Sequence, residues 1–120
     1  MLNRIIFTGD HIRAELSERQ TALETREFLA AAAAAAQAHQ CGRVLIVVKD
    51  SKPLFKVEEY GISEYFKALA ANRAFKVALL SDVGEIRASH EYIALLASQH
   101  RAQVQSFSSE PDALKWLVGS

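Results

Sequence analysis

The sequence predicts an α/β fold: a single sheet of about five strands, mostly parallel with an N-terminal antiparallel hairpin, and four helices. Two short runs, Val44–Val48 and Val77–Leu80, are continuously apolar, which is typical of parallel strands buried on both faces. These runs alternate with longer segments of helical character, and such alternation implies parallel pairing through right-handed crossovers. Residues 1–120 are the length of one domain.

A hairpin is expected to open the chain. Arg4–Phe7 and Ile12–Leu16 are short strand candidates, and Gly9 lies in the turn between them. In the second strand Arg13 and Glu15 alternate with apolar residues, so one face is buried and the other is wet. This alternation places the hairpin towards a sheet edge.

A long helix is expected to follow, ending near His39. Ser17 and Gln20 have the spacing of a capping box. The alanine run Ala30–Ala36 has the highest helix propensity available, and its small side chains allow close approach either to the sheet or to a second subunit. Gly42 is expected to end the helix in a left-handed conformation.

The second half of the chain alternates in the same way. Helices are expected over Glu58–Asn72 and Glu85–Gln99, and a weaker edge strand over Gln103–Phe107. Ser109–Asp112 has the cap, the acidic residues and the early proline of a helix start. Strand order is expected to follow the chain, with helices on both faces of the sheet.

Composition excludes several classes of function. Fourteen basic and fourteen acidic residues cancel, so the basic excess of a nucleic-acid-binding protein is missing. No apolar run approaches the roughly 20 residues that span a bilayer, and the first residues do not resemble a signal peptide. Cys41 is the only cysteine, so no intrachain disulfide forms. These features predict a soluble, cytoplasmic protein.

Four segments in order resemble the STAS/SpoIIAA-like family, which includes the anti-sigma factor antagonists. They are Gly42–Asp50, Gly61-Ile62 opening a helix, Lys76–Ser81, and the closing stretch Val104–Leu117. Some groups in this family are related in fold to the lipid-carrying CRAL-TRIO (Sec14-like) domains. The resemblance implies a single SpoIIAA-like domain that acts as a non-enzymatic binding or regulatory module.

The sequence departs from the antagonists at their phosphorylation site. Their Asp-Ser-Ser-Gly signature, with its phosphorylated serine, precedes the second helix. Aligning Gly61 with that glycine puts Glu58, Glu59 and Tyr60 in the other three positions. No serine is available for a phosphoserine switch, and Glu59 places permanent negative charge near a helix N-terminus. Tyr60 is either a modifiable residue or an aromatic anchor.

The carboxyl ends of the parallel strands are the expected ligand-binding rim. Polar residues follow the predicted strands there and are candidates to hold a partner or a small polar ligand: Lys49, Asp50, Ser51, Lys52, Ser81, Asp82 and Ser108. The alternative is that the acids and hydroxyls of this set are ordinary turn and helix-start residues.

Apolar residues gather after the first central strand. Leu54 and Phe55 lie in the loop and Tyr60 follows, so these residues either pack in the core or line a pocket or interaction patch. The main hypothesis is a protein-binding module, and the alternative is a small carrier or sensor of a lipid-like or other apolar ligand. The sequence also leaves open whether the chain forms a homodimer. An enzyme acting through Asp50 or Asp82 ranks last.

No catalytic, metal or cofactor motif accompanies these candidates. His11, His39, His90 and His100 are all expected away from the rim, and Gly-x-Ser-x-Gly is absent. Neither a histidine–cysteine cluster nor carboxylates at metal-ligand spacing occur, and no phosphate-binding glycine loop is present. Cys41, at the end of a helix, is expected to be a small, partly buried side chain.

Overall fold

The computed structural model describes residues 2–18, 20–49, 75–81, 84–99 and 102–118, which form a mixed sheet with helices on both faces. The described elements are β1 (Leu2–Phe7), β2 (Ile12–Ser17), α1 (Ala22–Ala38), β3 (Arg43–Lys49), β4 (Lys76–Leu80), α3 (Gly84–Gln99), β5 (Gln103–Phe107) and α4 (Glu110–Val118). Three helices therefore lie in the described part. The further helix expected over 58–72 falls outside it.

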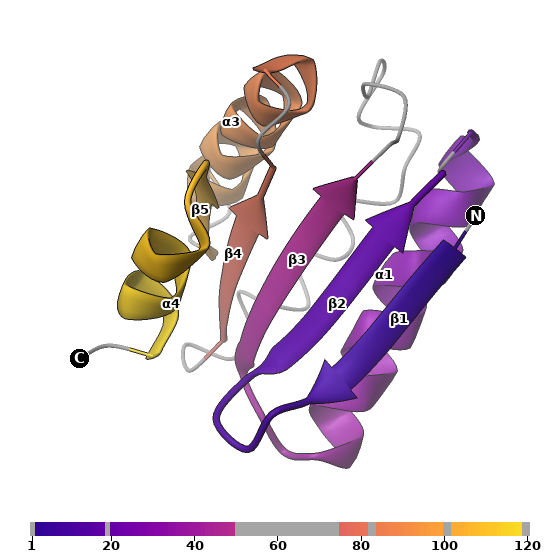
Figure 1. The fold of residues 1–120 in the computed structure, drawn as a ribbon, viewed down its shortest axis with the longest axis vertical. Coiled ribbons are helices and arrows are strands. Elements are labelled where there is room, and N and C mark those ends of the chain that lie inside the picture. The colour runs from indigo at the N-terminus through magenta and orange to yellow at the C-terminus, as the bar shows by residue number, and fades with distance from the viewer. Residues whose placement is uncertain (1, 19, 50–74, 82–83, 100–101, 119–120) are drawn as a thin grey trace.

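The strands lie in the order β1-β2-β3-β4-β5, so their order in the sheet follows the chain (Figure 1). β1 is antiparallel to β2, and the other three pairings are parallel. Both the order and the antiparallel hairpin confirm the sequence-based prediction. Because every parallel strand ends at the same edge of the sheet, residues that follow β2, β3, β4 and β5 are brought together there.

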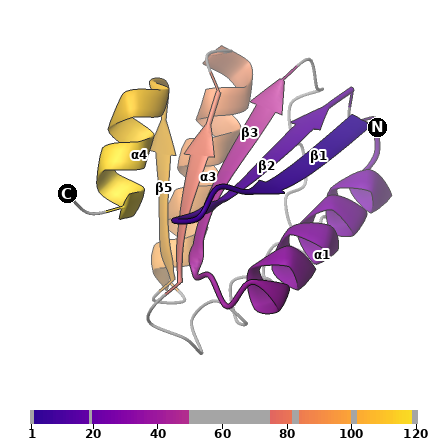
Figure 2. The same cartoon turned by 60° about the horizontal axis from the view of Figure 1, so that its bottom comes forward.

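The central strand β3 is buried on both faces, as its sequence predicts. Val44, Ile46 and Val48 pack in one core with α1 and α3, while Leu45 and Val47 pack in a second core with α4. Figures 1 and 2 show α4 on one side of the sheet and α1 and α3 on the other. Side chains alternate along a strand, so a continuous apolar run is needed where both faces are covered.

The start of α1 differs from the prediction. Ser17 is not its cap, because Ser17 is the last residue of β2 and pairs with Lys49 of β3. Thr21 is the N-cap instead: its hydroxyl accepts from the Glu24 N–H at 3.2 Å, and the Glu24 carboxylate accepts from the Thr21 N–H at 3.0 Å. Extending β2 by one more pair with β3 moves the capping box four residues later.

The end of α1 also differs. Gln40, and not Gly42, takes the left-handed conformation, with φ 49°. The Cys41 N–H then donates to the Ala36 carbonyl at 2.9 Å, which closes the helix end. The alanine run packs partly as expected inside the monomer, since Ala32 and Ala36 are buried in the core.

A tight turn joins β1 and β2 and supports the hairpin prediction. Gly9 has φ +99°, a conformation that L side chains rarely adopt, and the Thr8 N–H donates to the His11 carbonyl at 3.0 Å.

Among the described helices, none has the length and apolar character needed to cross a bilayer.

Candidate functional site

A cleft of about 240 Å³ lies at the carboxyl ends of β3, β4 and β5. Three residues of the predicted rim line it: Lys49 ends β3, Ser81 follows β4, and Ser108 follows β5. The parallel register brings them together although they are distant in the chain. Asp50, Ser51, Lys52, Asp82, Leu54, Phe55, Glu59 and Tyr60 lie outside the described residues.

Ser81 forms the floor of this cleft. The residue is 2% exposed, and its N–H donates to the Phe107 carbonyl at 3.3 Å, which ties the end of β4 to the end of β5. Lys49 also lines the cleft and is exposed. The cleft thus combines buried strand ends with an exposed cationic side chain.

Two charged residues at the cleft, Arg13 and Glu110, were not among the predicted site residues. Arg13 of β2 donates from Nε to Glu15 at 2.8 Å, and its guanidinium also donates to Glu110 in the first turn of α4. The solvent-facing side of β2 can be predicted from the alternation in its sequence. The pairing of Arg13 with Glu110 cannot be predicted in this way, because the two residues are 97 positions apart.

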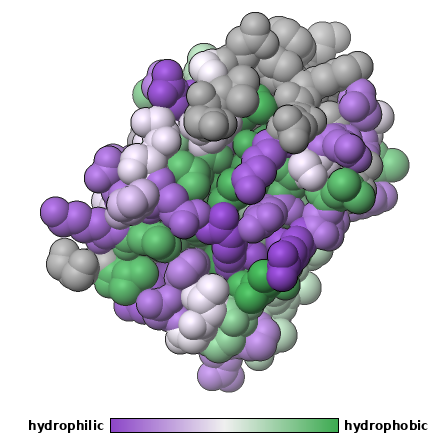
Figure 3. Space-filling model, in the orientation of Figure 1, coloured by the Kyte–Doolittle hydropathy of each residue, from purple (hydrophilic) through white to green (hydrophobic). Residues whose placement is uncertain are grey.

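This network favours the charged forms of Arg13 and Glu15. The hydrogen bond from Arg13 lowers the pKa of Glu15 below its ordinary value of 4.5. The hydrogen bonds to Glu15 and Glu110 raise the pKa of Arg13. Figure 3 shows hydrophilic residues gathered across the middle of this face, over β2 and β3. The cleft therefore opens onto a polar surface.

A second cleft, of about 330 Å³, lies at the opposite end of the sheet, between the hairpin turn and the end of α1. The Phe7 and His39 rings stack there with centroids 4.3 Å apart. Asp10, Cys41 and Arg43 also line it. None of these residues belongs to the predicted rim.

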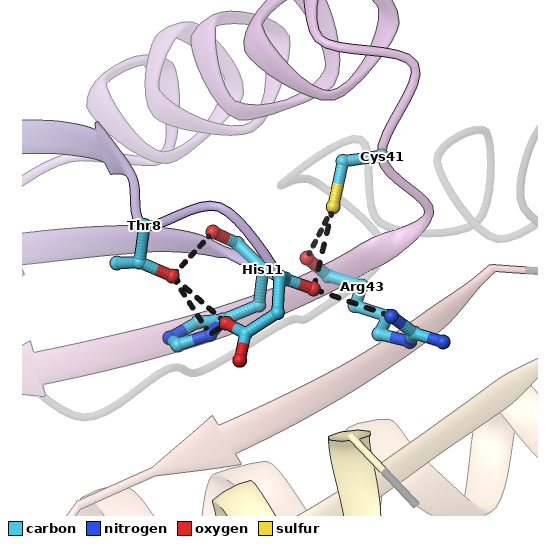
Figure 4. Close-up of polar contacts among 5 residues, drawn as sticks. Thr8, His11, Cys41 and Arg43 are labelled. Carbon is cyan, nitrogen blue, oxygen red and sulfur yellow. Dashed lines mark hydrogen bonds and ion pairs between the residues drawn. The ribbon is translucent and has the colours of Figure 1, made fainter.

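The polar groups of this second cleft are engaged with one another (Figure 4). Asp10 contacts His11 Nδ1 at 2.6 Å and accepts from the Thr8 hydroxyl at 3.0 Å, and the hydrogen bond with His11 is the main cause that lowers the pKa of Asp10. The Cys41 thiol lies 3.8 Å from the Asp10 carbonyl and 3.7 Å from the Arg43 carbonyl. Cys41 is partly buried, as the sequence predicts.

The described histidines lie away from the rim, as expected. His11 and His39 are at the second cleft, and His90 is buried on α3. Lys49, Ser81 and Ser108 thus have a salt-bridged Arg13 beside them and no imidazole. Within the residues described, no three histidine, cysteine or carboxylate side chains come together as a metal site.

Comparison with known proteins adds no relative to this picture. The sequence matches no family model, and no curated protein matches it. What the chain and its structure establish is an α/β fold built on a five-stranded mixed sheet.

Proposed function

We propose that this protein is a non-enzymatic binding module of the STAS/SpoIIAA-like type, which engages a protein partner through the carboxyl-end rim of its sheet. The observation that carries the proposal is the meeting of Lys49, Ser81 and Ser108 around one cleft beside α4. Such a cleft offers the exposed cation of Lys49 and the exposed Ser108, which suits recognition of polar or acidic side chains.

The strand order supports the same proposal. The pattern of apolar and alternating strands predicts a sheet whose order follows the chain after an antiparallel first strand, and that arrangement is present. The segment with Asp50, Phe55 and Tyr60 follows Lys49 directly in the sequence. In this proposal that segment supplies the rest of the contact surface.

Partner binding in this module does not depend on a phosphoserine. Glu58, Glu59 and Tyr60 occupy the positions that correspond to Asp-Ser-Ser of the antagonists. The charge at Glu59 is permanent, so binding is constitutive unless another input regulates it.

Affinity capture with the tagged full-length chain tests the proposal. Lys49→Glu reverses the charge at the cleft, and Lys115→Glu makes the same change at an exposed position on α4. We expect one partner to be recovered repeatedly with the wild type and with Lys115→Glu. Its recovery should fall about tenfold with Lys49→Glu and with Phe55→Asp. Repeated capture of no partner, or equal loss with both lysine variants, overturns the proposal.

The alternative function, carriage of a lipid-like or other apolar ligand, rests on Leu54, Phe55 and Tyr60. The rim cleft is lined by Val47, Val48 and Leu80 but also by Arg13, Lys49 and Glu110, and these charged groups would be desolvated beside an apolar guest. Native mass spectrometry of the protein purified from cells separates the two functions. A constant added mass of a lipid would favour the carrier, and the bare chain mass would exclude it.

A further inference from the structure

The first strand leaves one edge of the sheet open in the described part of the chain. β1 pairs with β2 alone there, through six consecutive residue pairs from Leu2–Ser17 to Phe7–Ile12. An edge strand exposes a row of backbone N–H and C=O groups, and proteins usually protect it with proline, lysine or a bulge. The sequence of β1, Leu-Asn-Arg-Ile-Ile-Phe, has neither proline nor lysine, and its register with β2 has no bulge.

β1 also carries exposed apolar side chains. Of the five large apolar side chains that are exposed in the described residues, Leu2 and Phe7 lie on β1 and Leu23 lies on α1. α1 runs beside β1 in both ribbon views (Figures 1 and 2). The exposed residues of α1 include Arg26 and Glu27 in its first half and Ala30, Ala33 and Ala34 in its middle.

We propose that two copies of this chain pair through β1, in antiparallel fashion about a two-fold axis, to form a homodimer with one continuous ten-stranded sheet. An antiparallel edge is complementary to a second copy of itself, since each outward N–H meets an outward C=O. The interface follows the outer edge of β1, whereas the rim cleft lies at the ends of β3, β4 and β5 and reaches β2 only through Arg13. Dimerisation and partner binding are measured separately, so either proposal can fail without the other.

Charge selects the register of this pairing. Directly opposed residues of an antiparallel pair point to the same face of the sheet. A two-fold axis between the strands must therefore pass between a residue and its own copy in the partner subunit. One such register sets Arg4 against Arg4 of the partner subunit, and like charges in direct opposition are destabilising. Shifting by one further residue in each copy sets Ile5 against Ile5 of the partner subunit and removes the repulsion.

The Ile5-centred register also extends the core. Ile5 is half-buried and packs at the margin of the core that α1 covers. An isoleucine pair on the two-fold axis would continue that core from one copy into the next. On the other face, Arg4 would lie opposite Ile6 of the partner subunit, so a charge introduced at Ile6 reports on the register.

Light scattering coupled to size-exclusion chromatography tests the dimer. The full chain is expected to elute at twice its mass of 13.3 kDa. Because Ile6 also pairs with Arg13 of its own strand pair, the charge variants are compared in an Arg13→Gln background. There Ile6→Lys, which sets a cation against Arg4 at both symmetric positions, should weaken dimerisation about tenfold, whereas Ile6→Glu should leave it intact or strengthen it. Leu95→Lys, at an exposed position on α3, is the control and should have no effect. A wild type of single-chain mass at high micromolar concentration overturns the proposal.

Cysteine cross-linking tests the register and does not depend on the stability of the Ile6 variants. In a Cys41→Ser background, two copies of Ile5→Cys should be joined by a short reagent with two thiol-reactive groups, because opposed residues have Cβ atoms about 5 Å apart, slightly more than a disulfide spans. Arg4→Cys should cross-link at least fivefold more slowly. Equal or faster cross-linking at Arg4 overturns the proposed register, and cross-linking at neither position overturns the interface.

Discussion

Arg13 of β2 binds Glu110 of α4, and this contact joins two residues that lie 97 positions apart in the chain. Arg13 also donates to Glu15 on its own strand, so one guanidinium links the wet face of the hairpin to the first turn of the last helix. Glu110 is well placed there, since a negative charge in the first turn complements the helix dipole. The contact thus closes one side of the rim cleft.

A double-mutant cycle measures how much this contact contributes. Arg13→Ala and Glu110→Ala should show a coupling of about 0.5 kcal/mol in the free energy of unfolding, because the pair is partly exposed. Urea denaturation at low salt and at 1 M NaCl is the measurement, and the coupling should shrink at high salt. The control cycle pairs Arg13 with Asp112, an exposed acid in the same turn of α4, where the coupling should be near zero.

Acid should weaken the fold partly through Glu15. Because Arg13 lowers the pKa of Glu15 in the folded state below its ordinary 4.5, the contribution is fully present above that ordinary value. It is lost as the pH falls through the lowered folded pKa. Glu15→Gln should therefore be less stable than the wild type at pH 7 by ~0.5 kcal/mol, with the difference vanishing near pH 2. Urea unfolding of both proteins across this pH range is the measurement. A difference in stability between Glu15→Gln and the wild type that stayed constant with pH would contradict the stabilising role of the Glu15 charge.

The position of the helix cap is open to a direct test. Thr21→Ala removes the hydroxyl that accepts from the Glu24 N–H, and it should cost about 1 kcal/mol of stability. Ser17→Ala should change stability by less than about 0.5 kcal/mol, since Ser17 ends a strand and caps nothing. Thermal or urea unfolding of the two variants gives the answer. A larger loss of stability for Ser17→Ala than for Thr21→Ala would mean that Ser17 is the N-cap, as the sequence pattern predicts.

Buried side chains between the sheet and α4 should contribute more to the free energy of unfolding than exposed apolar side chains do. Leu45 of β3 is fully buried in the core that α4 covers. Leu45→Ala should therefore lower the free energy of unfolding by about 3 kcal/mol, through lost transfer energy and the cavity that remains. Leu95 is 59% exposed on α3, and Leu95→Ala should cost under about 0.5 kcal/mol. Equal effects in urea unfolding would mean that α4 does not cover this face in solution.

The sequence alone determined the strands and their order, because each strand carries its own local pattern. The unbroken apolar runs of β3 and β4 require cover on both faces, and the alternation in β2 requires a wet face, so the central and peripheral strands could be told apart. The gathering of Lys49, Ser81 and Ser108 followed as well, since parallel strands end at one edge.

Only the tertiary structure decided the features that depend on contacts between distant residues. Pairing of Ser17 with Lys49 extends β2 and moves the cap to Thr21, and the path from α1 into β3 puts Gln40 in the left-handed conformation that Gly42 was expected to take. The Arg13–Glu110 contact likewise exists only because α4 packs back over β3 and β4. A local pattern specifies backbone preference, whereas the choice among similar residues at a boundary is made by the free energy of packing and pairing across the whole fold.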